Sequence, residues 1–131
     1  MIAAPKLDPD SLVFQQNDYF SPLRWFEVDW GSQVYTGLRS WRTATGQELL
    51  DGGPTGLTVD PRLVAAGAGG ALRNPDRLSD LTAYMLRDDT PLLGVGLDLA
   101  SRFGIDTGGR DYFGVPVPSG KGPEIGASEV G

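Results

Sequence analysis

The stretch that decides the fold runs from Gly109 to Glu129 and reads Gly-Arg-Asp-Tyr-Phe-Gly-Val-Pro-Val-Pro-Ser-Gly-Lys-Gly-Pro-Glu-Ile-Gly-Ala-Ser-Glu. Its prolines lack backbone donors and its glycines tolerate positive φ, so a regular ladder of hydrogen bonds cannot run through it. Only residues 124–129 are free of proline for long enough to add a short final strand. We therefore expect an ordered, irregular strap, and the alternative is a flexible tail.

The order of residues in this strap resembles the closing segment of right-handed parallel β-helix proteins of the pectate-lyase-like group. These often end in Asp-Phe-Phe-Gly-Asn-Pro-x-Pro-x-Gly-x-Gly-x-Asp-Ile-Gly-Ala-Tyr-Glu. Residues 35–48, Tyr-Thr-Gly-Leu-Arg-Ser-Trp-Arg-Thr-Ala-Thr-Gly-Gln-Glu, resemble a segment near the last coils of the same proteins. Val115 and Ser128 depart from the pattern, which usually has Asn and Tyr there, and these departures predict a looser cap.

The resemblance implies a mainly β chain that forms the terminal rungs and the C-terminal cap of a right-handed parallel β-helix. Residues 1–10 are then an N-terminal extension, residues 11–108 the terminal rungs with a helical insert and loops, and residues 109–131 the cap. At about 20 to 25 residues per coil, the chain holds fewer rungs than a stable β-helix needs. We therefore expect an upstream β-helix chain as partner, or self-association through the edge of residues 12–14.

Hydrophobic periodicity predicts the elements between these motifs. Residues 26–30 alternate as a strand with Phe26, Val28 and Trp30 on one face, and a turn at 31–32 leads to a second strand at 33–35. One short α-helix is predicted near residues 37–45, with Thr36 as a possible N-cap and Gly46 at its end. Residues 81–86 also alternate as a strand would.

Composition excludes several classes of function. The 131 residues carry a net charge of −6, which disfavours nucleic acid as a partner, and neither histidine nor cysteine is present. Disulfides, Ser-His-Asp and Cys-His catalysis, and zinc sites with imidazole or thiolate ligands are therefore excluded. The first ten residues do not read as a signal peptide, and no apolar run approaches the ~20 residues of a membrane span. The localisation stays open, although the family that the chain resembles is often extracellular.

The candidate carbohydrate-binding residues are Trp25, Glu27 and Asp29. Alternation places all three on the face opposite Trp30, and the two carboxylates, two apart on a strand, would lie about 7 Å apart. Such a pair suits a glycosidase or calcium site, and an exposed indole ring suits stacking on a sugar. The structural alternatives are a solvated strand face for the acids and a packing role for Trp25. Two further acids at positions 88–89 are typical of a turn, with a metal site as the alternative.

The resemblance implies that the chain is a C-terminal segment or small subunit of a β-helix protein that acts on or binds polysaccharide, such as a lyase or glycoside hydrolase. The substrate groove of such proteins lies along the middle coils, so we expect no catalytic residue, metal ion or cofactor in this chain. The alternative is a non-catalytic binding or structural module, such as an adhesin or a virion component, built on the same fold. An ordinary small β-rich protein is a third possibility.

Overall fold

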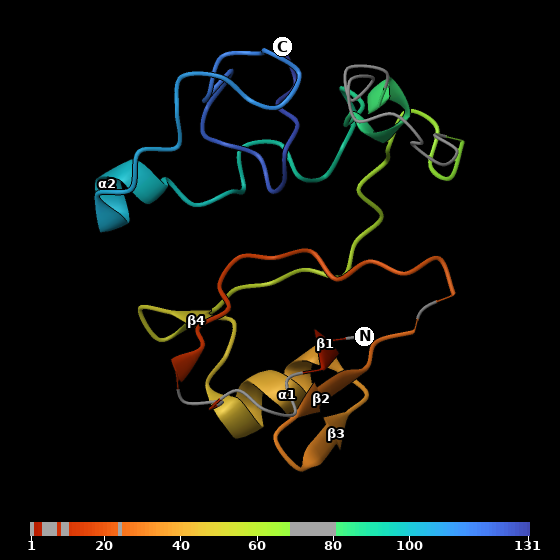
Figure 1. Cartoon of the computed structure of the whole chain (residues 1–131), viewed down its shortest axis with the longest axis vertical. Coiled ribbons are helices and arrows are strands. Elements are labelled where there is room, and N and C mark those ends of the chain that lie inside the picture. The colour runs from red at the N-terminus through yellow and green to blue at the C-terminus, as the bar shows by residue number, and fades with distance from the viewer. Residues whose placement is uncertain (1, 4–7, 9–10, 24, 69–80) are drawn as a thin grey trace. The chain divides into compact units, whose positions relative to one another are not determined.

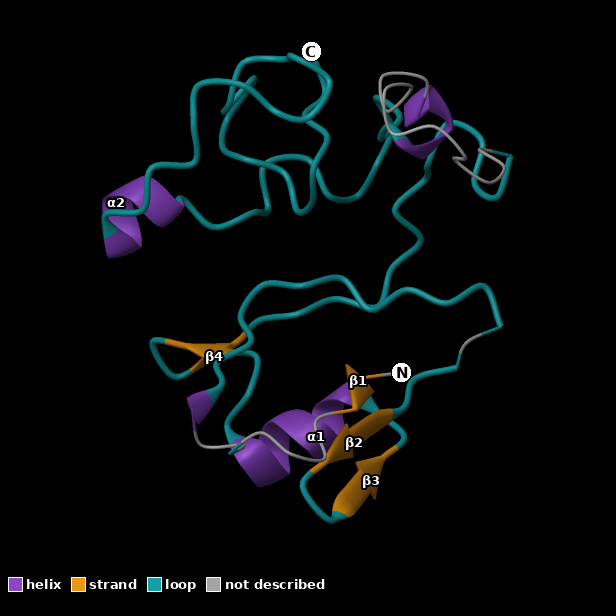
Figure 2. Ribbon diagram, viewed as in Figure 1, coloured by secondary structure: helices purple, strands orange, loops and turns teal. Residues whose placement is uncertain are grey.

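The computed structural model describes residues 2–3, 8, 11–23, 25–68 and 81–131. These residues form two compact units, unit 1 from Met1 to Asp60 and unit 2 from Pro61 to Gly131. Most of the predicted N-terminal extension, residues 1–10, lies outside the described residues. The described part has short strands in small mixed sheets, short helices and long irregular segments between them (Figure 2).

The larger sheet belongs to unit 1 and has the strand order β1-β2-β3 (Figure 1). Strand β1 (Ile2–Ala3) pairs in parallel with β2 (Val28–Trp30), and β2 pairs antiparallel with β3 (Gln33–Tyr35). Gly31 adopts φ 61° in the turn between β2 and β3, a conformation that suits glycine. The predicted strand, turn and strand at 26–35 are therefore confirmed, with the first strand shorter than expected.

Helix α1 (Leu38–Thr45) confirms the predicted short helix near residues 37–45. Gly46 ends it in the left-handed conformation, and its N–H donates to the carbonyl oxygen of Arg42, as expected for a glycine after the last turn. The prediction of Thr36 as N-cap was wrong. The N-cap is Gly37 in an extended conformation, and no side chain caps the first turn.

Aromatic packing forms the core of unit 1. Trp41 of α1 is fully buried against Val28 and Trp30 of β2, and the partly buried residues around them are Leu12, Phe14, Tyr19, Phe26, Tyr35 and Leu38. The ring of Trp41 meets those of Phe14, Tyr19 and Trp30 edge-to-face, with centroids 5.7, 5.8 and 5.5 Å away. This geometry is the favoured arrangement for aromatic pairs. The expectation that Trp30 belongs to the core is confirmed.

A second, smaller sheet follows α1 in unit 1. Strands β4 (Leu49–Leu50) and β5 (Gly53–Pro54) form a hairpin, and both turn residues, Asp51 and Gly52, have positive φ. Two positive φ values are typical of the tight turns that match the twist of paired strands. In the same unit, Asp18 and Leu57 form an isolated parallel bridge.

Unit 2 is mostly irregular. The predicted strand at residues 81–86 was wrong, because residues 81–84 form a 3₁₀ turn and only Leu86 bridges to another segment, at Leu63. Helix α2 (Leu99–Phe103), which the periodicity did not indicate, has Asp98 as its N-cap, and the carboxylate of Asp98 accepts from the N–H of Ser101 at 2.9 Å. A polar N-cap therefore starts a helix that buries none of its side chains.

The C-terminal strap is ordered and irregular, as predicted. Val117-Pro118 is a cis peptide, and residues 124–129 do not form the expected final strand. Their backbone donors bond to side chains instead: the N–H of Glu124 to Glu129, and that of Glu129 to Asp111. No helix in the described part of the chain is long and apolar enough to cross a membrane.

Candidate functional site

The end of α1 positions the N-terminal segment of unit 1. Gln47, directly after the terminating glycine, is buried, and its Oε1 accepts from the N–H of Phe14 at 2.7 Å. Its Nε2 donates to the carbonyl oxygen of Leu12 at 2.9 Å. The N–H of Glu48 donates to the carbonyl oxygen of Phe14 at 2.7 Å. Residues 12–14 are therefore held by the turn that follows α1, and they do not form a strand.

Glu48 is fully buried and holds the side chain of Tyr19 in place. Its Oε1 accepts from Nδ2 of Asn17 and from the hydroxyl of Tyr19, both at 2.6 Å, and its Oε2 accepts from Oγ1 of Thr55 at 2.9 Å. Burial, and after it the hydrogen bond and charge of Glu48, raises the pKa of Tyr19. Because the carboxylate is saturated with protein donors, we assign Glu48 a structural role.

A pocket of about 870 Å³ opens in unit 1 beside Tyr19. It is lined by Tyr19, Phe20, Ser21, Trp25, Phe26, Gly37, Leu38, Arg39, Arg42, Gly56, Leu57, Thr58 and Val59. Trp25 is 66% exposed and Phe20 is 39% exposed, so two aromatic rings at the pocket are accessible to solvent. Large exposed aromatic rings beside a pocket are typical of binding surfaces.

The charge at this pocket is opposite to that of the whole chain. Arg39 and Arg42 line it, and none of the described lining residues is acidic, although the chain has a net charge of −6. Arg42 is fixed in place, because its guanidinium donates to the carbonyl oxygens of Glu48, Thr55 and Gly56. Arg39 lies exposed on α1, so its guanidinium is accessible to an anion.

Of the three predicted site residues, the structure places only Trp25 at the pocket. Glu27 directly precedes β2 and Asp29 lies at its centre; both are half-buried, and neither lines the pocket. Within the described residues, no group of three or more acidic side chains could hold a metal ion. Trp25 lines the pocket together with Phe20 and Arg39, whereas the carboxylates of Glu27 and Asp29 lie outside its lining.

The sequence reasoning missed Phe20 and Arg39. A weak signal was present, because the aromatic residues concentrate between positions 19 and 41. The sequence around Arg39 gave no signal, because a single arginine on a short helix does not show which other segments line a pocket with it.

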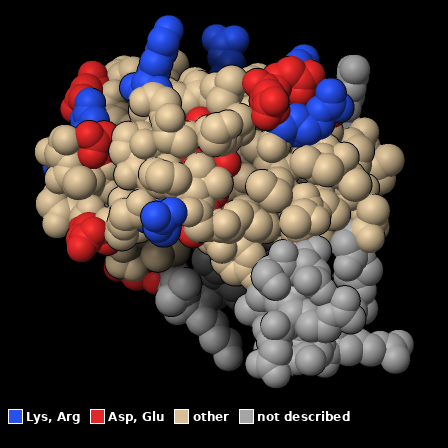
Figure 3. Space-filling view, turned by 90° about the horizontal axis from the view of Figure 1, so that it is seen from above, with Lys and Arg blue, Asp and Glu red and all other residues tan. Residues whose placement is uncertain are grey.

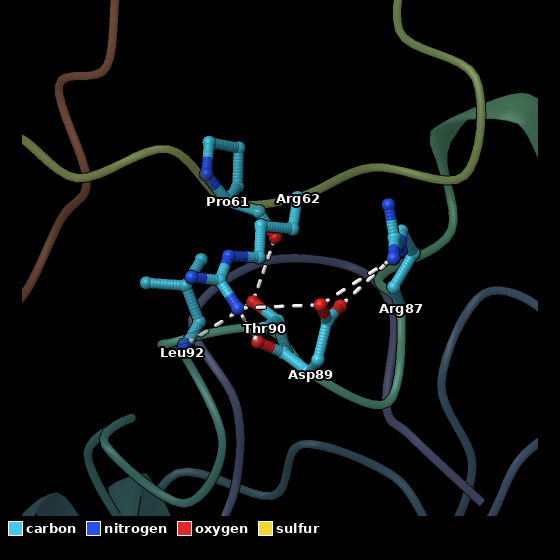
Figure 4. A network of polar contacts seen from close by, with 6 residues as sticks. All are labelled: Pro61, Arg62, Arg87, Asp89, Thr90 and Leu92. Carbon is cyan, nitrogen blue, oxygen red and sulfur yellow. Dashed lines mark hydrogen bonds and ion pairs between the residues drawn. The ribbon is translucent and has the colours of Figure 1, made fainter.

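The two acids at 88–89 lie in the predicted turn of unit 2 and are exposed. Asp89 makes ion pairs with Arg62 at 3.3 Å and with Arg87 at 3.2 Å (Figure 4). The neighbouring Thr90 is buried, and its hydroxyl donates to the carbonyl oxygen of Pro61 at 2.7 Å. This network joins the start of unit 2 to its central turn, and its exposed ion pairs contribute little stability. Figure 3 shows charged side chains in small groups on a face that is otherwise mostly uncharged where it is described.

A second pocket, of about 790 Å³, lies in unit 2, and its walls include the acids Glu124 and Glu129. A carboxyl pair with one raised pKa is a feature of glycosidase sites. Here, however, Glu124 Oε2 is buried away from solvent, and both oxygens of Glu129 accept backbone N–H groups, from Glu124 at 3.1 Å and Ser119 at 3.2 Å. A pair without access to substrate favours a structural role.

Comparison with known proteins gave no match to a family model, a curated protein or a solved structure.

Proposed function

We propose that this chain is the C-terminal part of a right-handed parallel β-helix protein, and that unit 1 binds polysaccharide at the Trp25 pocket without carrying a catalytic centre. The two sequence motifs supply the resemblance to such proteins. Parallel pairing supports it, because Ile2 pairs with Val28, and Asp18 with Leu57, between segments far apart in the chain. Parallel neighbours joined by long connections are what successive coils of a β-helix require.

The observation that carries the binding proposal is the exposure of Trp25, 66% of which remains in contact with solvent at the pocket. Tryptophan is usually well buried, so a ring left open beside a pocket is available for a ligand. The flat indole face complements the apolar face of a sugar ring, and Phe20 supplies a second ring nearby. Ser21 and Thr58 add hydroxyl groups to the same lining.

The charge of the pocket favours an acidic sugar. A guanidinium group binds a carboxylate through two parallel hydrogen bonds, and Arg39 is placed to offer this to a uronate unit. The described lining contains no carboxylate that would repel such a ligand. It also lacks a carboxyl pair for hydrolysis, which agrees with the proposal and equally with the alternative of a non-catalytic module.

Binding is tested by titrating the full chain with a uronate-containing oligosaccharide and with a neutral one of the same length, using calorimetry. We expect Trp25→Ala to weaken binding about tenfold, equivalent to about 1.4 kcal/mol. Phe103→Ala is the matched control, because Phe103 is an exposed aromatic residue in unit 2, outside this pocket. Arg39→Gln should weaken only the uronate ligand. Equal affinities for the wild type and Trp25→Ala would overturn the proposal.

The proposed partner is an upstream β-helix chain or a second copy of this one. Residues 12–14 offer a poorer edge than expected, because Leu12 and Phe14 are already bonded to Gln47 and Glu48. One edge of the larger described sheet is β3, where Val34 is 60% exposed. An exposed edge strand with an apolar residue is a site for strand addition.

Light scattering after size exclusion should show association that Val34→Lys weakens. A monodisperse wild-type monomer at high concentration would contradict this.

A further inference from the structure

Acidic side chains fasten the C-terminal strap of unit 2. Asp111 accepts from the N–H groups of Phe113 and Val115 through Oδ1, at 2.9 and 2.7 Å, and from Glu129 through Oδ2 at 2.7 Å. Glu129 in turn accepts from the N–H groups of Glu124 and Ser119. Because the strap forms no strand within these residues, these side-chain bonds take the place of a ladder.

Within this arrangement, two carboxyl groups are buried together. Glu124 is 7% exposed and Glu129 is 5% exposed. Oε2 of Glu124 is out of contact with solvent and has no hydrogen-bond partner among the described residues. An ionised carboxylate with one oxygen buried and without a donor would be costly, whereas a neutral carboxyl group is less costly to bury. This burial favours the protonated form of Glu124.

We propose that the buried carboxyl group of Glu124 carries a proton and donates it in a hydrogen bond to Glu129, and that this contact is a latch that holds residues 119–129 closed and opens when the proton leaves. With the proton present, the neutral carboxyl group of Glu124 donates to Glu129. Loss of the proton to solvent leaves two like charges in a site with little water. Their repulsion separates Glu129 from the N–H groups of Ser119 and Glu124, which releases the strap.

Contacts of the strap with residues 94–96 limit this release to part of the strap. The carbonyl oxygen of Pro123 accepts from the N–H of Gly96 at 2.7 Å, and a Cβ at Gly96 would lie only 2.4 Å from the carbonyl oxygen of Glu124. The backbone of Pro123 and Glu124 is therefore packed tightly on Gly96. Movement is expected at Glu129 and at Ser119, whose N–H group Glu129 holds.

The pKa of Glu124 agrees with this geometry. Burial, followed by the hydrogen bond and the charge of Glu129, raises the pKa of Glu124 from 4.5 to about 7. The other charged groups at the same pocket are Asp98, Asp106, Arg110, Asp111 and Lys121. Among them, hydrogen bonds from Ser101 lower the pKa of Asp98.

The test is amide hydrogen exchange on the full chain at about pH 5.5 and about pH 8.5, after correction for the intrinsic rates. We expect protection of the Ser119 and Glu124 N–H groups to fall about tenfold or more between these conditions. In Glu124→Gln the side-chain amide donates to Glu129 without titrating, so the fall should disappear. The matched control is Asp106→Asn, which alters an exposed acid at the same pocket and should keep the wild-type pH dependence.

A second measurement uses the wild type alone and needs no variant. The carboxyl carbon of Glu124 in the labelled wild type should titrate near neutral pH in a heteronuclear spectrum. A midpoint at the ordinary value for glutamate would overturn the latch. Protection that is the same at both pH values, or that falls equally in Glu124→Gln, would also overturn it.

Discussion

Alanine at Gly56 should destabilise unit 1 far more than alanine at Gly52. Both glycines have positive φ, 74° and 79°, so each substitution carries the cost of a left-handed alanine, about 1 to 2 kcal/mol. A Cβ at Gly52 would meet no atom within 4 Å, whereas a Cβ at Gly56 would lie 2.8 Å from Cδ and Oε2 of Glu48. The two variants therefore share the backbone cost and differ in the clash.

The clash matters because Glu48 has no room to move. Its side chain is fully buried, and its carboxylate is held by Asn17, Tyr19 and Thr55. Displacement that breaks one hydrogen bond to this charged group costs about 1.5 to 3 kcal/mol. We therefore expect about 3 to 5 kcal/mol for Gly56→Ala and about 1 to 2 kcal/mol for Gly52→Ala.

Urea denaturation followed by tryptophan fluorescence measures this difference. All three tryptophans of the chain, Trp25, Trp30 and Trp41, lie in unit 1, so the signal reports that unit. The free energy of unfolding should fall with urea concentration at the same slope in both variants, because the surface exposed on unfolding is the same. Equal midpoints for Gly56→Ala and Gly52→Ala would refute the reasoning, since the contact with Glu48 would then carry no energy.

Three further predictions follow from side chains that bond to the backbone. Gln47→Ala leaves the N–H of Phe14 and the carbonyl oxygen of Leu12 without partners, so unit 1 should lose about 2 to 4 kcal/mol in the same fluorescence assay. Asp111→Ala should abolish exchange protection of the Val115 N–H in unit 2, and unchanged protection would show that its carboxylate is dispensable. Glu124 binds its proton more tightly in the folded state, so its contribution to the stability of unit 2 should be complete below about pH 4.5 and be lost as the pH rises toward about 7. Thermal unfolding followed by NMR measures this last effect, and stability that rises over that range would contradict it.

Local patterns predicted unit 1 well. The alternation at 26–30, the turn at 31–32 and the helix that ends at Gly46 are set by neighbours in sequence, and the structure confirms them. For Trp25 the sequence left open an exposed ring and a packing role, and the structure shows the side chain exposed. Its neighbours in the pocket could not be predicted, because Phe20 and Arg39 come from other segments that line the same pocket only in the folded chain.

Unit 2 was predicted poorly, because polar contacts between distant residues determine it. Residues 81–86 alternate like a strand, but no neighbouring strand is described for them to join, and only Leu86 forms a bridge. The strap was correctly expected to be irregular, but the sequence did not indicate what its acids bind. Their partners are backbone N–H groups, which are present at every residue except proline and leave no signal in the pattern.

The bonds from Gln47 and Glu48 to the N-terminal segment have a consequence for the order of folding. They join residues 29 to 35 positions apart, whereas α1 and its terminating glycine need only local contacts. Closing so long a loop costs entropy before the two side chains can repay it. We therefore expect α1 and its final turn to form early, and residues 12–19 to dock last on a surface that is already complete.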